Sequence, residues 1–358
     1  MFGLISYEEI YGHEEEYIFI DVRSQKEAFE EPMIGALNIP VLLNEERDVV
    51  GTLYVRESAE AAKEQGIEFI SRRLPEIFKE VQELYKNKHG KKLVIFCARG
   101  GMRSGSLHSL LNSLGINCYK LEGGYKAYRN FIIKKMEDFS NKIDFIVLYG
   151  NTGVGKTEML YKLEDKGYDV LDLEGCANHR GSILGGVGLG PCNTQKRFDA
   201  LVYHKLRYRK SNLIFIEGES KRIGRILIPD SLFEKMYEGA KIKIDADIEN
   251  RAERLVKEYT SFENVKEQLE EALGVLKKHI SQERVEQYKD LVDRGDYRTV
   301  AIELMEKYYD PRYGTSAKKK SFRCEIEIND IDKELYKLEN IYKEVSEELG
   351  VDLYEQQK

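Results

Sequence analysis

The chain has 358 residues, more than one typical domain, and this length predicts two domains. Hydrophobic residues make up 42% and charged residues 33%; no apolar run approaches the roughly 18–20 residues of a membrane span, and no signal peptide is recognisable, so we expect a cytoplasmic protein without a membrane partner. The net charge of −7 argues against bulk, non-specific binding to nucleic acid, so we expect no DNA partner. A protein with this net charge can still carry a local basic patch.

The N-terminal third alternates short apolar runs with helical patterns. We expect strands over residues 17–23, 93–96 and 118–122, with a further short strand near residue 40. Helices are expected over 24–30 and 104–114 and from 123 onward, whereas the charged segment 43–88 is expected to be irregular and only partly helical. This alternation predicts a small parallel sheet covered by helices on both faces.

A reactive cysteine is predicted at the end of the strand 93–96, in Cys97-Ala-Arg-Gly-Gly-Met-Arg-Ser104. A thiolate at the carboxyl end of a strand is stabilised by loop amides and by the N-terminus of the helix that follows. Arg99 and Arg103 add positive charge, and Gly100 and Gly101 allow the loop to curl so that several N–H groups face one anion. We therefore predict a nucleophile inside an anion-binding loop, with Cys97, Arg99 and Arg103 as catalytic residues.

The other four cysteines, at positions 118, 176, 192 and 324, form no CxxC pair and no zinc-ligand spacing. A disulfide scaffold is not expected in a protein of this class. We interpret these four residues as ordinary small apolar side chains.

This part of the chain resembles the rhodanese domain. The resemblance rests on Asp21-Val-Arg23, the segment 32–40, the Cys97 loop and Gly123-Gly-Tyr125. It implies that Cys97 carries sulfur or selenium as a persulfide or perselenide. Cys97 and Arg103 also satisfy Cys-x5-Arg, the pattern of cysteine phosphatases that share this fold, in which the same loop would hold a phosphoryl group. The stretches around the loop favour chalcogen transfer.

A second domain is expected after the charged segment 134–142, which gives domains over residues 1–135 and 143–358. The apolar strand 143–149 runs directly into Gly150-Asn-Thr-Gly-Val-Gly-Lys-Thr157, and a helical pattern follows over 156–166. This is the P-loop pattern G-x-x-x-x-G-K-[ST] in its confirming strand–loop–helix context.

The P-loop residues have distinct expected roles. Gly150, Gly153 and Gly155 let the backbone amides wrap a di- or triphosphate. Lys156 reaches the terminal phosphate, and the Thr157 hydroxyl is a ligand that suits a magnesium ion. The fold class is therefore α/β: a rhodanese-like parallel-sheet domain followed by a P-loop α/β domain with a helical C-terminal extension.

Candidate substrate-binding residues follow the next two strands. The expected strand 168–174 leads into a Gly-rich stretch with His179 and Arg180, a place where α/β sheets bind ligands, although His179 equally suits a role in bracing the loop. The strand 212–217 ends in Glu217, which with Glu219 is a candidate to hold metal-bound water near the P-loop, and Arg222 adds a cation that suits an anionic substrate.

Beyond a last expected strand at 241–245 the pattern is helical, most clearly over 263–278, 282–294 and 331–349. Arg251 and Arg254 lie three residues apart on one expected helix. They have the spacing of lid arginines that reach phosphates, but we favour their interpretation as surface charges.

Together the two domains resemble the family of tRNA 2-selenouridine synthases, over most of the chain to about residue 315. The supporting stretches, in order, are Asp172-Leu-Glu174, residues 177–182, Gln195 with Phe198, residues 217–224 and Tyr309-Asp-Pro311. The resemblance implies that wobble 2-thiouridine in the anticodon region of tRNA is S-geranylated with geranyl diphosphate, and that selenium from selenophosphate then replaces sulfur. It implies no tightly bound cofactor, and it makes an enzyme that supplies selenophosphate a candidate partner.

Two other functions stay open on sequence alone. One is an ATP-dependent, kinase-like enzyme with a rhodanese or Cys-x5-Arg phosphatase domain, which would turn over nucleotide without tRNA. The other is a non-catalytic regulator that binds tRNA or nucleotide and in which Cys97 is inert; slow alkylation of Cys97 at neutral pH would favour it.

Overall fold

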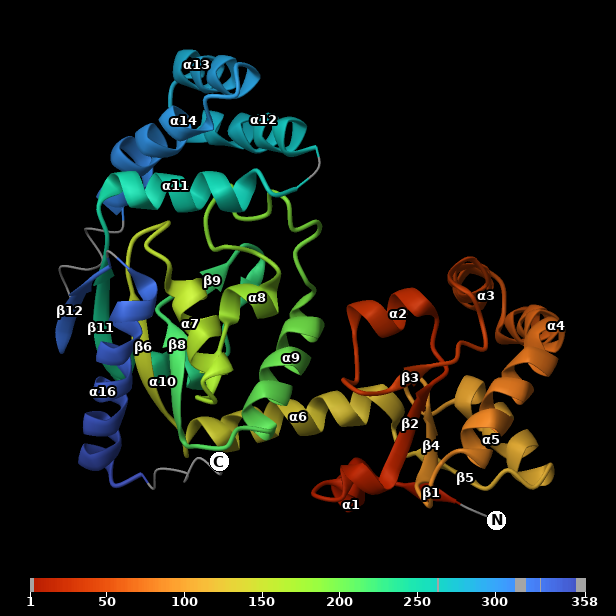
Figure 1. The fold of residues 1–358 in the computed structure, drawn as a ribbon. Coiled ribbons are helices and arrows are strands. Elements are labelled where there is room, and N and C mark those ends of the chain that lie inside the picture. The colour runs from red at the N-terminus through yellow and green to blue at the C-terminus, as the bar shows by residue number, and fades with distance from the viewer. Residues whose placement is uncertain (1–2, 263, 313–319, 329, 352–358) are drawn as a thin grey trace. The chain divides into compact units, whose positions relative to one another are not determined.

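The computed structural model describes residues 3–262, 264–312, 320–328 and 330–351 (Figure 1). The chain forms two compact units, one of residues 1–135 with 199–203 and the other of residues 136–198 with 204–358. Each unit is built on its own five-stranded sheet. Within the described residues, a search for a helix of sufficient length and hydropathy to span a bilayer finds none.

The sheet of the first unit is parallel throughout, in the order β1-β5-β4-β2-β3. Its strands are β1 (Leu4–Ile5), β2 (Tyr17–Asp21), β3 (Leu37–Asn38), β4 (Lys92–Phe96) and β5 (Cys118–Leu121). Residues 93–96 of β4 are fully buried, as expected for the central strand of a sheet covered on both faces. Because all strands run the same way, their carboxyl ends meet at one edge, where Cys97 follows β4.

The helices of this unit are α1 (Tyr7–Ile10), α2 (Gln25–Glu30), α3 (Asn44–Arg56), α4 (Ala59–Lys86), α5 (Met102–Ser113) and α6 (Gly124–Ser140), with the short helix η1 (Glu14–Glu16). Ile77 and Val81 of α4 and Leu107 and Leu111 of α5 join the core formed with the strands. Residues 134–140, in the expected boundary segment, belong to α6.

The prediction of an irregular segment over 43–88 was wrong, because nearly all of it is helical. Ser58 accepts a hydrogen bond from the Ala61 N–H at 3.0 Å and caps α4, which then runs for 28 residues. The preceding α3 has no buried residue, so its apolar pattern is too weak to reveal a helix.

The sheet of the second unit is also parallel, in the order β12-β11-β6-β8-β7. Its strands are β6 (Asp144–Tyr149), β7 (Val170–Leu171), β8 (Leu213–Glu217), β11 (Ala240–Asp245) and β12 (Cys324–Glu327). The chain leaves the central β6 to build two strands on one side and later two on the other. The loop after β6 therefore lies at the switch point, where open α/β sheets bind ligands.

Two strand predictions in this unit need correction. Only Val170 and Leu171 of the expected strand 168–174 are extended, because Asp172 accepts a hydrogen bond from the Gly175 N–H at 2.7 Å and starts the helix α8 (Leu173–Ala177). The strand 241–245 is not the last, since the edge strand β12 follows it. Only Ile326 of β12 is buried, so the sequence carries little apolar signal there.

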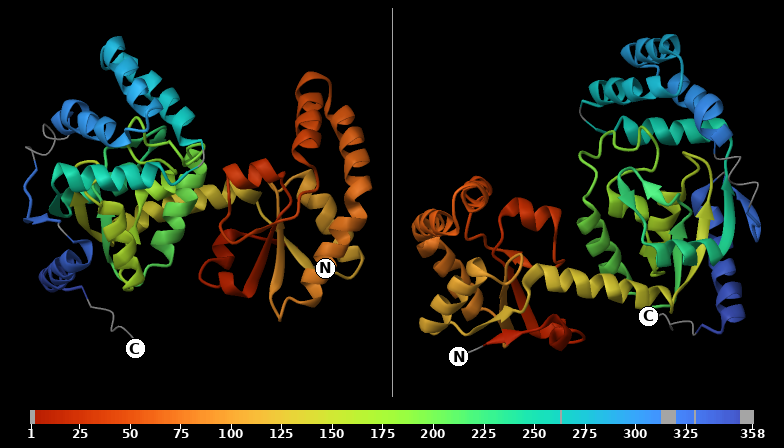
Figure 2. Two further views of the ribbon diagram at one scale, coloured as in Figure 1. Left: turned by 45° about the horizontal axis from the view of Figure 1, so that its top comes forward. Right: turned by 180° about the vertical axis from the view of Figure 1, so that it is seen from behind.

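The remaining elements are α7 (Lys156–Asp165), α9 (Gln195–Arg207), α10 (Asp230–Glu238), α11 (Ile248–Tyr259), α12 (Val265–Val275), η2 (Leu276–Lys278), α13 (Gln282–Asp293), α14 (Tyr297–Leu304), η3 (Met305–Tyr309) and α16 (Ile331–Leu349), with the small antiparallel pair β9 (Arg222–Ile223) and β10 (Ile226–Leu227). Figures 1 and 2 show α11 to α14 stacked beyond one end of the sheet. These helices share a separate apolar core that includes Leu273, Tyr288 and Leu304.

Arg251 joins this helical extension to the P-loop. Its Nε donates to the Thr152 carbonyl at 3.0 Å, and its two terminal nitrogens donate to the Asp310 carboxylate at 2.8 and 2.7 Å. The Arg251 side chain is buried, so its interpretation as a surface charge was wrong. Arg254 lies on the same side and donates to the Val154 carbonyl at 3.3 Å.

We expect Arg251→Ala to destabilise the second unit by about 3–5 kcal/mol, because it leaves the Asp310 carboxylate and the Thr152 carbonyl without their partner. Arg298→Ala is the matched control, since the Arg298–Glu249 pair is more than half exposed and is expected to be worth under about 1 kcal/mol. Urea unfolding followed by circular dichroism measures both changes. Equal losses of unfolding free energy in the two variants would contradict the role of Arg251 as a link between the P-loop and the helical extension.

Candidate functional sites

Cys97 lies directly after β4, with its side chain buried. Its Sγ is 3.1 Å from the Oγ of Ser104, in the first turn of α5. The thiol therefore faces the N-terminal turn of that helix, where the helix dipole favours a negative charge. This is the placement that the sequence predicted.

The pKa of the Cys97 thiol is lowered below its ordinary value. Burial by itself raises it, but hydrogen bonds from the Ser104 hydroxyl and backbone N–H, the charge of Arg103, and the Arg99 backbone N–H together outweigh burial. Cys118 provides the contrast: it is equally buried, and burial raises the pKa of that thiol to about 12. Cys97 is thus set up to react as a thiolate, whereas Cys118 is inert packing.

We expect Ser104→Ala to raise the pKa of Cys97, because the thiolate loses a hydrogen-bond donor. The measurement is the pH dependence of iodoacetamide alkylation at Cys97, read by peptide mass spectrometry. Ser106→Ala is the matched control on the same helix, since the Ser106 hydroxyl is exposed and donates to the Met102 carbonyl. An unchanged midpoint in Ser104→Ala would show that the backbone alone sets the reactivity.

The start of α6, which includes Gly124, holds the Cys97 loop in place. The N–H of Tyr125 donates to the Cys97 carbonyl at 2.9 Å, and that of Lys126 donates to the Ala98 carbonyl at 3.0 Å. A Cβ on Gly124 would lie 2.3 Å from the Cys97 carbonyl oxygen, so no other residue permits this approach. Gly100 has a positive φ of 65°, which gives the loop its curl.

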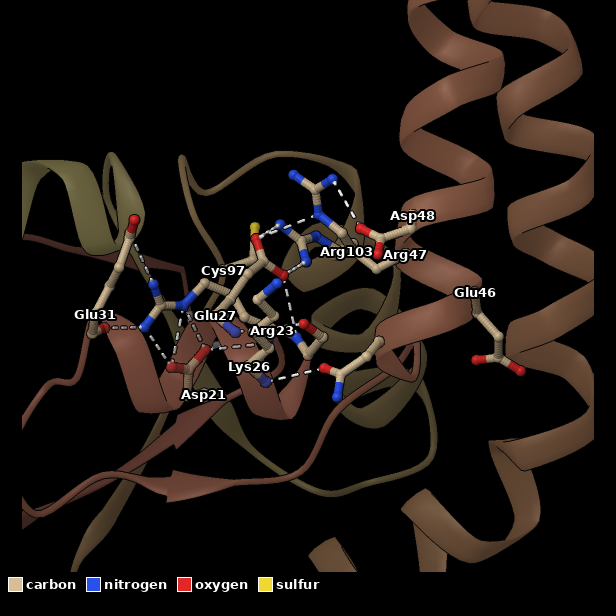
Figure 3. Close-up of polar contacts among 12 residues, drawn as sticks. Asp21, Arg23, Lys26, Glu27, Glu31, Glu46, Arg47, Asp48, Cys97 and Arg103 are labelled. Atoms are coloured by element: carbon tan, nitrogen blue, oxygen red, sulfur yellow. Dashed lines mark hydrogen bonds and ion pairs between the residues drawn. The ribbon is translucent and has the colours of Figure 1, made fainter. Parts of the chain in front are cut away.

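Arg103 is engaged by a carboxylate that the sequence reasoning missed. Its guanidinium donates to both oxygens of Glu27, at 2.6 and 3.0 Å, as Figure 3 shows. Burial raises the pKa of Glu27, but the hydrogen bonds and charge of Arg103 outweigh this and lower it overall. Arg103 is therefore held in a fixed position, whereas Arg99 is exposed. In the sequence, Glu27 is recognisable only as the partner of Ser24 in a capping box. That pattern gives no indication of its second contact, the one with Arg103.

Asp21 and Arg23, the pair in the predicted rhodanese stretch, form a buried support beside this network (Figure 3). Arg23 donates from Nη2 to Asp21 at 2.6 Å and to the Glu31 carbonyl at 2.7 Å, and its guanidinium lies 4.1 Å from the centre of the Tyr125 ring. These contacts fix the segment that binds the Cys97 loop.

The P-loop follows β6, and Lys156 is the first residue of α7. The Lys156 Nζ donates to the Gly150 carbonyl at 2.9 Å, and Thr157 is half-buried beside it. Gly153 and Gly155 both have positive φ, at 81° and 96°, which explains why the pattern needs glycine there. The five predicted residues of this loop are therefore brought together at the carboxyl end of β6.

Four carboxylates gather next to the P-loop, at the carboxyl ends of β7 and β8. Glu217 pairs in register with Leu148 of β6, and its Oε1 accepts from the Glu174 N–H at 2.7 Å. The pKa of Glu174 and that of Glu219 are both raised, first by burial; the Lys156 charge opposes the rise in both residues. Asp172 completes the group and adds to the raised pKa of Glu174 and Glu217.

Glu217 in this group of carboxylates is suited to bind magnesium or a water molecule on magnesium. Oε2 of Glu217 is buried and has no hydrogen-bond partner among the described residues, as expected of a carboxylate that awaits a cation or its water. Within the described residues, three metal-ligand atoms come together only at the exposed His13, Glu15 and Glu16. Magnesium does not need three protein ligands close together, because it is bound by one or two carboxylates together with substrate phosphates.

The structure places the other predicted residues around this group. His179 has a ring packed against Gly224, where a Cβ would lie 3.0 Å from it; burial lowers the pKa of His179, and the charge of Arg180 adds to this. Arg180 forms an ion pair with Glu258 of α11 and donates to the Val187 carbonyl at 2.7 Å. These contacts hold both side chains in place. Nδ1 of His179 is buried without a hydrogen-bond partner among the described residues, and Arg222 is exposed on β9.

Two cavities of different character flank the P-loop. The first, which we call the apolar cavity, has a volume of about 60 Å³ and is lined by Thr152, Ser182, Leu184, Leu255, Val256, Tyr259, Leu269, Val292, Tyr297, Val300, Ala301, Leu304, Met305 and Tyr309. The second, which we call the basic cavity, has a volume of about 380 Å³. Its lining includes Gly150, Asn151, three lysines (Lys221, Lys243 and Lys320), two acids (Glu219 and Asp245) and the rings of Tyr149, Phe233, Tyr237 and Phe322. The sequence reasoning predicted neither.

Comparison with known families assigns both units. Residues 7–131 match the model of the rhodanese-like domain, and residues 143–339 match that of the "tRNA 2-selenouridine synthase AAA domain". The second match covers more than half of the chain.

Full-length relatives carry the same name. A protein named tRNA 2-selenouridine synthase from Pseudomonas fluorescens is 30% identical in an alignment of 335 positions that covers 86% of this chain and 90% of that protein. One from Hydrogenovibrio crunogenus is 30% identical over 87% of this chain and 91% of its own length. Another, from Nitrosomonas eutropha, is 35% identical, but the match spans only 67% of this chain and 62% of that relative's length. The chain belongs to the tRNA 2-selenouridine synthase family.

Proposed function

We propose that this protein converts wobble 2-thiouridine in tRNA to 2-selenouridine in two steps, S-geranylation with geranyl diphosphate and exchange of the alkylated sulfur for selenium from selenophosphate. The observation that carries the proposal is the pairing, in one chain of this family, of a thiol with a lowered pKa and a P-loop with an adjacent apolar cavity. Alkylation suits the exchange, because it converts sulfur into a better leaving group.

The P-loop serves the first step. Its amides, Lys156 and Thr157 bind the diphosphate of the prenyl donor, and magnesium at Thr157 and Glu217 would neutralise further charge. The thiouridine sulfur attacks the allylic carbon, the carbon–oxygen bond breaks, pyrophosphate leaves with the electron pair, and the base loses its N3 proton. The donors that bind the diphosphate also stabilise the departing pyrophosphate.

The Cys97 loop serves the second step. The Cys97 thiolate attacks the phosphorus of selenophosphate, the selenium–phosphorus bond breaks and selenide leaves, while the loop amides with Arg99 and Arg103 hold the negative charges. The selenide bonds to C2 of the uridine, the carbon–sulfur bond breaks and the geranyl thiolate leaves. Water then hydrolyses the phosphorylated Cys97, which releases phosphate and frees the thiol. A separate enzyme that makes selenophosphate would supply the selenium.

The basic cavity is our candidate entry for the anticodon nucleotides. It joins Gly150 and Asn151 of the P-loop to three lysines and four aromatic rings, and the three lysines outnumber its two acids, Glu219 and Asp245. Lysines bind the sugar-phosphate backbone and rings stack with unpaired bases, which are the two contacts that single-stranded RNA needs. An acidic protein with one such local site is compatible with the net charge of −7.

Mass analysis of nucleosides tests the proposal. Purified protein is incubated with 2-thiouridine-containing tRNA and geranyl diphosphate, with and without selenophosphate. We expect S-geranyl-2-thiouridine in the first sample and 2-selenouridine in the second. No change in either sample, with ATP consumed instead, would overturn the proposal in favour of a kinase-like enzyme.

A further inference from the structure

We infer that Arg47 of α3 is a further binding residue of the Cys97 site and binds the phosphoryl oxygens of the anionic selenium donor. The inference rests on the proposed function and extends it, because that function gives the Cys97 loop a phosphoanion as substrate but no binding group from outside the loop. Arg47 lies in a segment that the sequence analysis expected to be irregular.

The Cys97 site needs more positive charge than Arg103 supplies. Both terminal nitrogens of Arg103 donate to Glu27, at 2.6 and 3.0 Å, so this carboxylate balances the charge of Arg103. The Cys97 thiolate adds a negative charge of its own. A selenophosphate ion, like a phosphate group on a side chain, carries about two negative charges at neutral pH. A further cation beside Glu27 would therefore favour the approach of the donor.

Arg47 faces the same carboxylate as Arg103. Its Nε lies 3.8 Å from Oε1 of Glu27, and Figure 3 shows the guanidinium groups of both arginines directed at Glu27. Two guanidinium groups against one carboxylate leave one positive charge. Asp48 lies 3.7 Å from Arg47, but its side chain is 74% exposed, so solvent and salt screen its charge. Arg47 thus supplies the charge that Glu27 takes from Arg103.

The N–H groups of Arg47 are available to a ligand. Its distances to the carboxylates of Glu27 and Asp48 are too long for hydrogen bonds. Among the described residues the Arg47 side chain has no hydrogen-bond partner, and 44% of it is exposed. An arginine in this state can donate to two oxygens of one phosphoryl group, the geometry that its planar fork favours.

The fold fixes the position of Arg47 through its neighbours on two helices. Asn44, the first residue of α3, accepts from the Lys26 N–H at 2.9 Å and ties α3 to α2, which carries Glu27. Arg47 follows about one turn later on α3, and Gly51 one turn beyond it. A Cβ on Gly51 would lie 2.8 Å from Nη1 of Arg47, so the guanidinium occupies the space that a side chain there would fill.

This use of space explains the glycine inside α3. Glycine destabilises a helix interior relative to alanine, and α3 has no buried residue whose close packing would require it. Outside the backbone of its own helix, the described atoms within 4 Å of a Cβ on Gly51 all belong to the Arg47 side chain.

An anionic alkylating reagent tests the charge at Cys97 without tRNA. Iodoacetate carries a carboxylate and iodoacetamide is neutral, so the ratio of their alkylation rates reports attraction of the anion and cancels a change in thiolate population. We expect Arg47→Ala to lower this ratio roughly threefold. Arg56→Ala is the matched control, since Arg56 is exposed in the last turn of the same helix.

The kinetics of selenouridine formation identify the ligand. We expect Arg47→Ala to raise the KM for selenophosphate about tenfold and to leave the KM for tRNA within about twofold, because a charged hydrogen bond to the donor is lost. Arg47→Lys keeps the charge without the fork of donors and should give an intermediate KM for selenophosphate. A rise in the KM for tRNA instead would mean that Arg47 binds the RNA backbone, and would overturn the inference.

Gly51→Ala separates donor binding from stability, because the first should weaken while the second improves. The added methyl group favours the helix and displaces the Arg47 guanidinium, so the urea midpoint should rise and the KM for selenophosphate should rise several-fold. Gly66→Ala in α4 is the matched control: a Cβ there meets only Val50, at 3.9 and 4.0 Å, so the KM should not change.

An unchanged alkylation ratio in Arg47→Ala, or an unchanged KM for selenophosphate, would overturn the inference while the proposed function stands. If the wild-type protein forms no selenouridine, the proposed function fails, and the alkylation ratio still decides whether Arg47 attracts anions to Cys97.

Discussion

Lys156→Ala is expected to reduce geranyl transfer to thiolated tRNA by at least a hundredfold. The Lys156 ammonium sits at the start of α7 beside the loop amides, where it would meet the charge that develops on departing pyrophosphate, and removing one such donor typically costs two to three powers of ten in rate. The measurement is the initial rate of S-geranyl-2-thiouridine formation, read by mass spectrometry.

Lys162→Ala is the control for this change. It removes a lysine from the same helix, but Lys162 pairs with Asp332 on its exposed side and takes no part in the P-loop. Full geranyl transfer by Lys156→Ala would contradict the assignment of the P-loop to the prenyl donor.

Cys97→Ser is expected to abolish selenouridine formation and to leave geranylation within about twofold of the wild type. A serine hydroxyl does not ionise at neutral pH and cannot replace the Cys97 thiolate in the release of selenium, whereas the P-loop and its cavity belong to the other unit. Selenouridine is measured with selenophosphate present and geranyl-thiouridine without it.

Cys324→Ser provides the comparison, because Cys324 is a partly buried cysteine of β12, where burial raises the pKa of its thiol. It should retain both steps. Loss of geranylation together with selenation in Cys97→Ser would mean that Cys97 supports the structure or serves both reactions.

The parts predicted well from the sequence depend on local signals. A buried strand, a glycine-rich turn and a helix start lie within about ten residues around Cys97, and the same holds around Lys156. Glycine at positions of positive φ and apolar residues in a central strand each leave a direct mark on the sequence. The α/β class and both loops follow from such marks.

The parts that the sequence did not reveal depend on contacts between distant residues. Glu27 binds Arg103, which lies 76 positions away in the sequence, and Arg251 binds Asp310, which lies 59 positions away. The residues next to Glu27 and Asp310 in the sequence give no indication of these partners. The apolar cavity is likewise assembled from side chains that a helical pattern identifies only as core. Arg251 shows the consequence, since we interpreted it as a surface charge although its side chain is buried.

The edge strand β12 was not predicted from the sequence for a different reason. Two of its four residues are glutamates, only Ile326 within the strand is buried, and its pairing with β11 supplies the stabilisation that its own composition lacks. Strand propensity expresses fit to a half-buried surface rather than an intrinsic backbone preference, so an edge strand of this kind is hard to recognise.

The division of the two steps between the two units is the central claim, and supplying the intermediate tests it most directly. Lys156→Ala protein receives tRNA that already carries S-geranyl-2-thiouridine, together with selenophosphate, and selenouridine is measured by nucleoside mass spectrometry. We expect selenouridine at close to the wild-type rate, because the Cys97 loop is unchanged and the P-loop step has been bypassed. No selenouridine from this variant, with the wild-type protein converting the same tRNA, would contradict the separation of the two steps.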